Sequence, residues 1–69
     1  MVDAMDFTGL IKATINSINS KKTITPNVKQ QALRFYFYCQ DNLGSANDES
    51  KSLYKDFDRF LREKGILPR

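Results

Sequence analysis

Hydrophobic residues recur at the spacing of an α-helix in three stretches of the chain. The first stretch runs from about residue 6 to residue 18, and its helical positions are occupied by Phe7, Leu10, Ile11, Thr14, Ile15 and Ile18. An α-helix turns about 100° per residue, so this spacing gathers these side chains on one face. Asp6 would lie at the positive end of the helix dipole, where a negative charge is favourable. We therefore expect a helix over residues 6–18.

The second stretch begins with a strong helix-start signal. Thr25 can cap the first turn with its hydroxyl, and Pro26 suits the first helical position, where a missing N–H costs nothing. We expect this helix over residues 26–42. Its apolar face consists of Val28, Ala32, Phe35, Tyr36 and Cys39. Because Cys39 belongs to this face, we interpret it as a small core residue rather than a nucleophile.

The aromatic run of the second helix is too wide for one neighbouring helix to cover. Leu33 and Phe37 form a second stripe, about 100° or more around the helix from the first face, and Tyr38 lies on the far flank. Two interpretations remain open. In one, the helix lies between the other two and buries rings on both sides. In the other, Phe37 or Tyr38 is exposed and marks a docking or stacking surface.

The third stretch predicts a helix over residues 51–64. Its core face consists of Leu53, Phe57, Phe60 and Leu61, with Tyr54 at the edge. Asp58 and Arg62 stand four residues apart in the favourable order for an ion pair. Gly65 occupies the position where helices commonly end in a left-handed residue. The end of this helix is therefore well defined.

The segments between the helices are short and polar. Residues 41–50 are rich in turn formers. Ser45 and Asp48 have the spacing of a capping box, and Asp48 or Ser50 could equally cap the third helix. The β-branched run Thr23–Thr25 could form a very short strand. These patterns predict an all-α fold, a compact three-helix domain that occupies residues 1–69 as a single unit.

Composition narrows the class of protein. The chain has 69 residues, a net charge of +3, one cysteine and no histidine. A domain of this size has a net stability of only about 3–5 kcal/mol unless a disulfide or metal adds to it, and one cysteine allows no internal disulfide. The N-terminal stretch carries Asp3 and Asp6 where an export signal would be positive, and no long apolar run follows. We expect a cytoplasmic protein with no membrane partner.

The outer face of the third helix carries a stripe of cations. Lys51, Lys55, Arg59 and Arg62 fall within about 80° of one another on a helical projection. Such a stripe suits phosphate contact, because lysine and arginine neutralise the backbone charge of a nucleic acid. Tyr54 stands beside the stripe and Tyr38 could stack on an unpaired base, which would favour single-stranded DNA. A stripe flanked by acids can equally be a solvated face without a ligand.

The second half of the chain resembles a known segment. The stretch from residue 33 to residue 66 resembles the winged-helix segment at the C-terminal end of viral, phage and plasmid primase-helicases, through Tyr36, Cys39, Phe57, Leu61, Gly65 and Ile66. The resemblance implies a trihelical winged-helix-like core without a wing, in which Thr23–Thr25 pairs with residues 66–67. It also implies that the third helix occupies the recognition position, and that the chain assists a larger replication protein of a mobile element or phage.

Catalysis is the least expected function. The chain lacks a histidine general base, a glycine-rich phosphate loop and paired acids across a cleft, so we expect no catalytic residue, no metal site and no cofactor. The first hypothesis is a small nucleic-acid-binding or replication-accessory protein that acts with a larger partner. The alternative is a protein–protein adaptor or inhibitor that docks through exposed aromatics, with Leu33, Phe37 and Tyr38 at the interface. A homodimer formed through the same residues is a third option.

Overall fold

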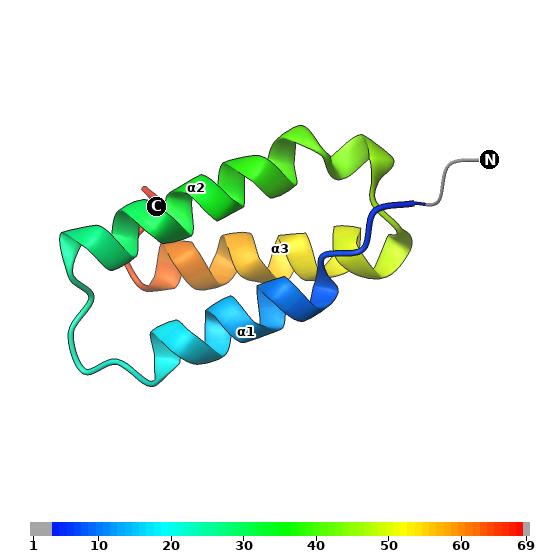
Figure 1. Cartoon of the computed structure of the whole chain (residues 1–69). Coiled ribbons are helices and arrows are strands. Elements are labelled where there is room, and N and C mark those ends of the chain that lie inside the picture. The colour runs from blue at the N-terminus through cyan, green and yellow to red at the C-terminus, as the bar shows by residue number, and fades with distance from the viewer. Residues whose placement is uncertain (1–3, 69) are drawn as a thin grey trace.

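A computed structural model describes residues 4–68 of the chain. This part contains the α-helices α1 (Thr8–Asn19), α2 (Pro26–Asp41) and α3 (Asp48–Glu63), with the 3₁₀ turn η1 (Leu43–Ser45) between the last two (Figure 1). The predicted all-α three-helix fold is therefore confirmed. None of the helices in residues 4–68 is long and apolar enough to cross a membrane.

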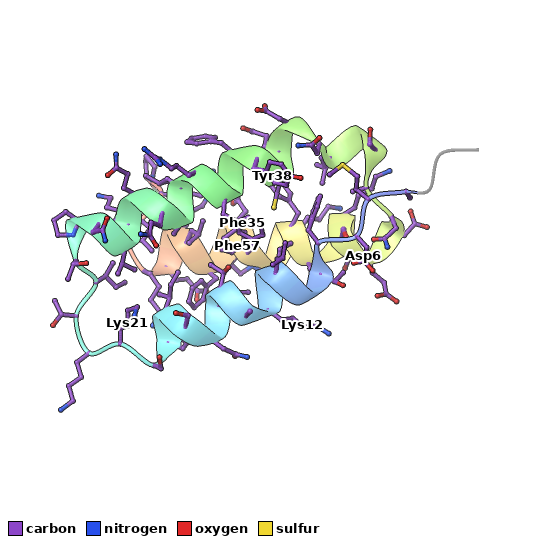
Figure 2. All side chains as sticks on the ribbon, viewed as in Figure 1. Asp6, Lys12, Lys21, Phe35, Tyr38 and Phe57 are labelled. Atoms are coloured by element: carbon purple, nitrogen blue, oxygen red, sulfur yellow. The ribbon has the colours of Figure 1, made fainter. Side chains whose placement is uncertain are left out.

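At the start of each of the first two helices, a side-chain oxygen accepts a hydrogen bond from a backbone N–H of the first turn. The Thr25 hydroxyl accepts from the Val28 N–H at 3.2 Å, and Pro26 opens α2 as predicted. By contrast, α1 begins two residues later than predicted, and Asp6 precedes it (Figure 2). The Asp6 carboxylate accepts from the Thr8 N–H at 3.0 Å and from the Thr8 hydroxyl at 2.6 Å. These hydrogen bonds lower the pKa of Asp6.

The start of α3 corrects the predicted caps. Neither Asp48 nor Ser50 caps the helix, because the Asn47 side chain accepts from the Ser50 N–H at 2.9 Å. The Ser50 side chain is instead fully buried, and its hydroxyl accepts from the Phe7 N–H at 3.0 Å. It also donates to the Asp6 carboxylate at 3.5 Å. The helix thus begins three residues earlier than predicted, and its first turn holds the segment that leads into α1.

The end of α3 has the predicted left-handed termination. Gly65 has a φ of 77°, a conformation that glycine adopts without a steric penalty. The Gly65 N–H donates to the Arg62 carbonyl at 3.1 Å, and the Ile66 N–H donates to the Leu61 carbonyl at 2.9 Å. The chain therefore folds back onto α3, and Ile66 and Leu67 are buried in the core.

The expected pairing of Thr23–Thr25 with residues 66–67 is wrong. Across residues 4–68 the chain forms no strand, and its one β-type contact is an isolated parallel bridge between Met5 and Ala46. The Thr25 carbonyl instead accepts from the Lys29 N–H in the first turn of α2, and the N–H groups of residues 66 and 67 donate to the Leu61 carbonyl. The fold is a plain three-helix bundle in the described region.

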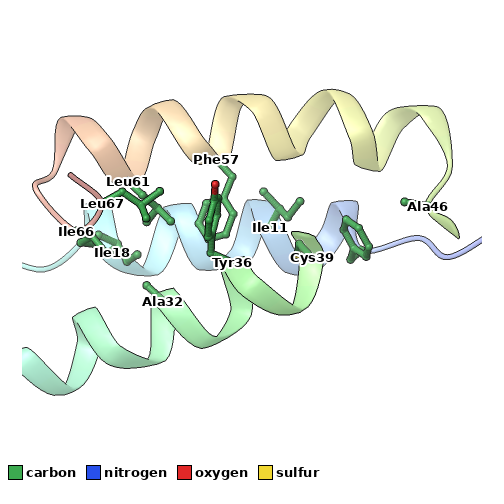
Figure 3. Close-up of a cluster of buried hydrophobic side chains, with 11 residues drawn as sticks. Ile11, Ile18, Ala32, Tyr36, Cys39, Ala46, Phe57, Leu61, Ile66 and Leu67 are labelled. Atoms are coloured by element: carbon green, nitrogen blue, oxygen red, sulfur yellow. The ribbon is translucent and has the colours of Figure 1, made fainter. Parts of the chain in front are cut away.

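The core lies along the inner face of α3 (Figure 3). Both α1 and α2 pack against α3, and they make few contacts with each other. At the centre, the fully buried Phe57 ring meets the rings of Phe35 at 5.7 Å and Tyr36 at 6.1 Å between centroids. Cys39 is a core residue, as predicted, and burial raises the pKa of its thiol to about 11. The central helix is thus α3 and not α2.

The buried hydroxyl of Ser50 generates the first prediction. Ser50→Ala removes the acceptor of the Phe7 N–H, and an unpaired buried amide costs about 1–3 kcal/mol. We expect the urea midpoint to fall accordingly, by a large share of the total stability of so small a domain. Ser52→Ala, at an exposed site on the same helix, is the matched control and should change the midpoint little. Equal stability of the two variants would contradict this role of Ser50.

Candidate nucleic-acid interface

The outer face of α3 presents three of the four predicted cations to solvent. Lys51, Lys55 and Arg59 are exposed, and within residues 4–68 no carboxylate forms an ion pair with any of them. They follow one another at intervals of four residues, which corresponds to steps of about 6 Å along the helix axis. We call these three residues the cation row. The buried residues Phe57 and Leu61 lie on another face of α3, and all three side chains of the row are accessible to solvent.

Arg62, the fourth predicted cation, is held by the protein itself. Its Nε donates to Asp58 Oδ1 at 2.7 Å, which confirms the predicted ion pair, and its Nη1 donates to the Pro68 carbonyl. A phosphate would have to compete with both acceptors. We therefore separate Arg62 from the cation row and assign it a structural contribution at the end of α3.

Tyr54 also has internal partners. Its hydroxyl donates to the Tyr36 hydroxyl at 3.0 Å, and the two rings stack with their centroids 5.2 Å apart. Beside this pair, Tyr54 lines a shallow depression of about 400 Å³ together with Leu43, Gly44, Lys51 and Lys55. The depression is mainly apolar and opens between two lysines. A planar base could rest there while the lysines meet its phosphates, although the tyrosine is not a projecting ring.

A hydrogen-bonded chain joins α2 to α3 and continues from Tyr54 to Arg62. The Tyr36 hydroxyl donates to Asp58 Oδ2 at 2.5 Å, and Asp58 accepts from Arg62 through its other oxygen. Arg62 first and Tyr36 second lower the pKa of Asp58. Burial and the Asp58 hydrogen bond raise the pKa of Tyr36. Sequence reasoning missed the contribution of Tyr36. Tyr54, Asp58 and Arg62 share one helix, so their spacing is readable from the sequence, whereas Tyr36 reaches them from α2.

The three predicted partner-binding residues do not form one surface. Leu33 is half-buried, whereas Phe37 and Tyr38 are each 49% exposed, which favours the docking interpretation of the aromatic run. The Phe37 ring packs edge-on against the Tyr36 ring, with the two centroids 5.4 Å apart. The Tyr38 ring stacks on the Phe35 ring, with centroids 6.5 Å apart (Figure 2). Since Tyr38 follows Phe37 directly, it points about 100° away from Phe37 around the helix axis. A partner that touches one ring therefore need not touch the other.

Charge is divided unevenly between the helices. No acidic residue occurs between Asp6 and Asp41, a stretch that contains Lys12, Lys21, Lys22, Lys29 and Arg34. In contrast, the sixteen residues of α3 contain four cations and five acids. The cation row is therefore a local feature of a helix with mixed charge, and the positive half of the protein is the one built from α1 and α2. This division was readable in the sequence, but the helix-by-helix projection did not reveal it.

Comparison of the chain with protein-family models, with curated proteins and with solved structures gave no match. The resemblance to the C-terminal segment of primase-helicases therefore stays a prediction. Its six matching positions have structural explanations in this fold. Among them, Cys39, Phe57 and Leu61 are core residues, and Gly65 supplies the left-handed turn.

The carboxylate of Asp58 generates a prediction about acid stability. Its pKa is lowered in the folded state, so its contribution is present above the unfolded pKa of about 3.9 and is lost as pH falls through the folded value. We expect Asp58→Asn to lower stability at pH 7 by about 1 kcal/mol and to flatten the loss of stability below pH about 4. Chemical denaturation at a series of pH values measures both effects.

The matched control for this experiment is Asp56→Asn, which changes an exposed carboxylate on the same helix. Tyr36→Phe keeps the ring in the core and removes only the hydroxyl that donates to Asp58. It should reproduce part of the loss at pH 7. If the acid unfolding curves of Asp58→Asn and the parent protein had the same shape, the ion pair would contribute nothing measurable.

Proposed function

We propose that the chain is a small, non-enzymatic nucleic-acid-binding module that acts beside a larger partner. The observation that carries this proposal is the cation row of Lys51, Lys55 and Arg59, which is exposed and has no ion pair in the described part of the chain. Cations arranged in this way neutralise phosphates and release counterions, which gives affinity without choice of sequence. A role in replication rests on the resemblance described above.

The cation row has only three members, and this small number supports an accessory role. Three phosphate contacts correspond to the weak, non-specific range of nucleic-acid affinity, with dissociation constants of about 10⁻⁴–10⁻⁶ M. A module of this kind becomes effective when a partner holds it close to the strand, because the second contact is then intramolecular. The depression between Lys51 and Lys55 favours a single strand, since only an unpaired base could enter it.

The buried thiol supports a function without catalysis. Cys39 is the single cysteine of the sequence, and it is 0% exposed. Burial raises the pKa of the thiol to about 11, so at neutral pH it carries its proton. A buried, protonated thiol is a poor nucleophile. We therefore assign Cys39 to packing.

The salt dependence of binding tests the proposal. We expect a fluorescent single-stranded oligonucleotide to bind, and its affinity to fall about 20-fold between about 50 and 200 mM salt if three phosphates are contacted. A duplex with the same number of contacts would lose about 40-fold. The variant in which Lys51, Lys55 and Arg59 are all alanine should lose binding and keep its helical circular dichroism, because these residues lie away from the core.

A second triple variant controls for net charge. Replacing Lys12, Lys22 and Lys29 with alanine removes the same number of exposed positive charges from other parts of the surface. This control should retain most of the affinity if the cation row is the binding site. Equal losses in both triple variants would show that only the overall charge matters, and undiminished binding by the α3 variant would refute the proposal.

A second candidate function is protein docking, and a specific observation favours it. Phe37 and Tyr38 expose nearly half of their surface, and aromatic side chains are common anchors of interfaces. If oligonucleotides fail to bind even at low salt, this function becomes the better explanation. Phe37→Ala is then the informative variant in binding assays with candidate proteins, because its ring is removed without opening the buried core.

A further inference from the structure

A groove runs between α1 and α2 on the side of the bundle away from the cation row. It has a volume of about 510 Å³ and is open to solvent, because the two helices pack on α3 and touch each other little. Its lining comes from both helices, with Leu10, Ala13, Ser17 and Lys21 on one side and Val28, Gln31, Ala32 and Phe35 on the other. Neither the cation row nor the depression beside Tyr54 shares a residue with it.

The groove is apolar at its floor and along one wall. Ile18 and Ala32 reach into it from the buried core, and Val28 is half-buried at its edge. Leu10 is 59% exposed, the most exposed of the large hydrophobic residues that the structure describes. The polar lining consists of Lys21 and the neutral side chains of Thr14, Ser17, Asn27 and Gln31. The floor of this groove therefore suits a ligand with an apolar ridge.

The charge around the groove has one sign. Lys21 lines one end and Lys22 follows it in the connecting loop, while no aspartate or glutamate lines the groove. The whole stretch from residue 7 to residue 40, which builds both walls, contains five cations and no acid. Within a Debye length of about 10 Å, this field favours a negatively charged ligand.

We propose that the α1–α2 groove docks an acidic amphipathic helix of a partner protein. The twelve residues of α1 extend for about 18 Å, which matches three turns of a partner helix laid along the groove. Leucine-type side chains on one face of that helix would contact Leu10, Val28 and Phe35, in the manner of helix-in-groove recognition. Its acidic side chains would reach Lys21 and Lys22 at the rim.

A nucleic acid fits this groove less well than a protein helix. The floor is aliphatic, and its one ring, Phe35, already packs against Phe57 and Tyr38. Base stacking therefore has no open platform there, in contrast to the aromatic sites that bind single strands. Aliphatic side chains bind such a floor more favourably, because the contact removes apolar surface from water and adds dispersion attraction.

A second copy of the chain is also a poor occupant. Its α1 and α2 would bring cations against cations, because neither helix offers an acid before Asp41. The acidic helix is α3, but the apolar face of α3 is already buried by α1 and α2 in its own molecule. No helix of the described chain thus combines a row of acids with an exposed apolar face. The occupant must come from a different protein.

This inference does not depend on nucleic-acid binding. The groove and the cation row lie on opposite sides of the bundle, so both could be occupied in one assembly. A docked partner helix would hold the module in place and leave the outer face of α3 exposed. The larger partner invoked above would then be recognised by acidity and helical amphipathicity, and not by the exposed Phe37 ring.

The experiment uses a labelled peptide of about 14 residues with leucines at positions i, i+3, i+4 and i+7 and glutamates on the other face. We expect saturable binding to the full chain, with amide chemical-shift changes concentrated on Ala13, Ser17 and Gln31. Leu10→Asp and Lys21→Glu should each weaken binding at least about tenfold. Both sites tolerate polar side chains because Leu10 is mostly exposed and Lys21 lies in a loop.

Matched variants separate this site from the rest of the surface. Phe37→Asp changes an exposed apolar side chain elsewhere on α2, and Lys55→Glu reverses a charge of the cation row. Both should bind the peptide as the parent protein does, while Lys55→Glu should weaken oligonucleotide binding. A failure of the groove proposal is therefore distinguishable from a failure of the nucleic-acid proposal.

Any one of the following outcomes would overturn the inference. The first is an absence of saturation up to about 1 mM peptide. The second is equal binding of a scrambled peptide, or of one with lysine in place of glutamate. The third is a set of chemical-shift changes on α3, or competition for the groove by an oligonucleotide. The fourth is a dependence of the groove signals on protein concentration without peptide, which would identify a second copy as the occupant.

Discussion

Burial of the Phe57 ring is the interaction on which the rest of the structure depends. Phe57 and Leu61 are both 0% exposed, and they stand one turn apart on the inner face of α3. The rings of Phe35 and Tyr36 reach Phe57 from α2, and α1 covers the same inner face with Ile11 and Ile18. In a chain of 69 residues, one such stripe accounts for most of the apolar surface that folding can remove from water. All three helices are positioned by it.

This central position of α3 divides the surface into two unlike sides. The outer face of α3 is left polar, because its inner face already contacts both other helices, and it carries the cation row beside acids of the same helix. On the other side, α1 and α2 make few contacts with each other, so Leu10 and Phe35 border an open groove with cations around it. The outer face of α3 suits the phosphates of a nucleic acid, and the groove suits an amphipathic helix with acidic side chains.

The sequence was sufficient to predict features that depend on neighbours in the chain. Thr25 and Pro26 start α2, and Gly65 ends α3, as local capping chemistry requires. The sequence was insufficient where the hydrogen-bond partner of a side chain is distant along the chain. Ser50 looks like a cap, but its hydroxyl bonds to Phe7, 43 residues away, and the Tyr36 hydroxyl finds Asp58 22 residues away. Such partners depend on how helices face each other, which hydrophobic spacing alone does not determine.

The weak contact between α1 and α2 also has a consequence for how the bundle comes apart. Each of the two helices can separate from α3 without breaking an extensive interface with the other. Native-state hydrogen exchange would then reveal partial openings in which α1 or α2 detaches singly, while the amides of α3 exchange only on global unfolding. A ligand that bridged the two outer helices would join these separate openings into one. Its binding would thus be visible as slower exchange far from the contact itself, along the whole length of both helices.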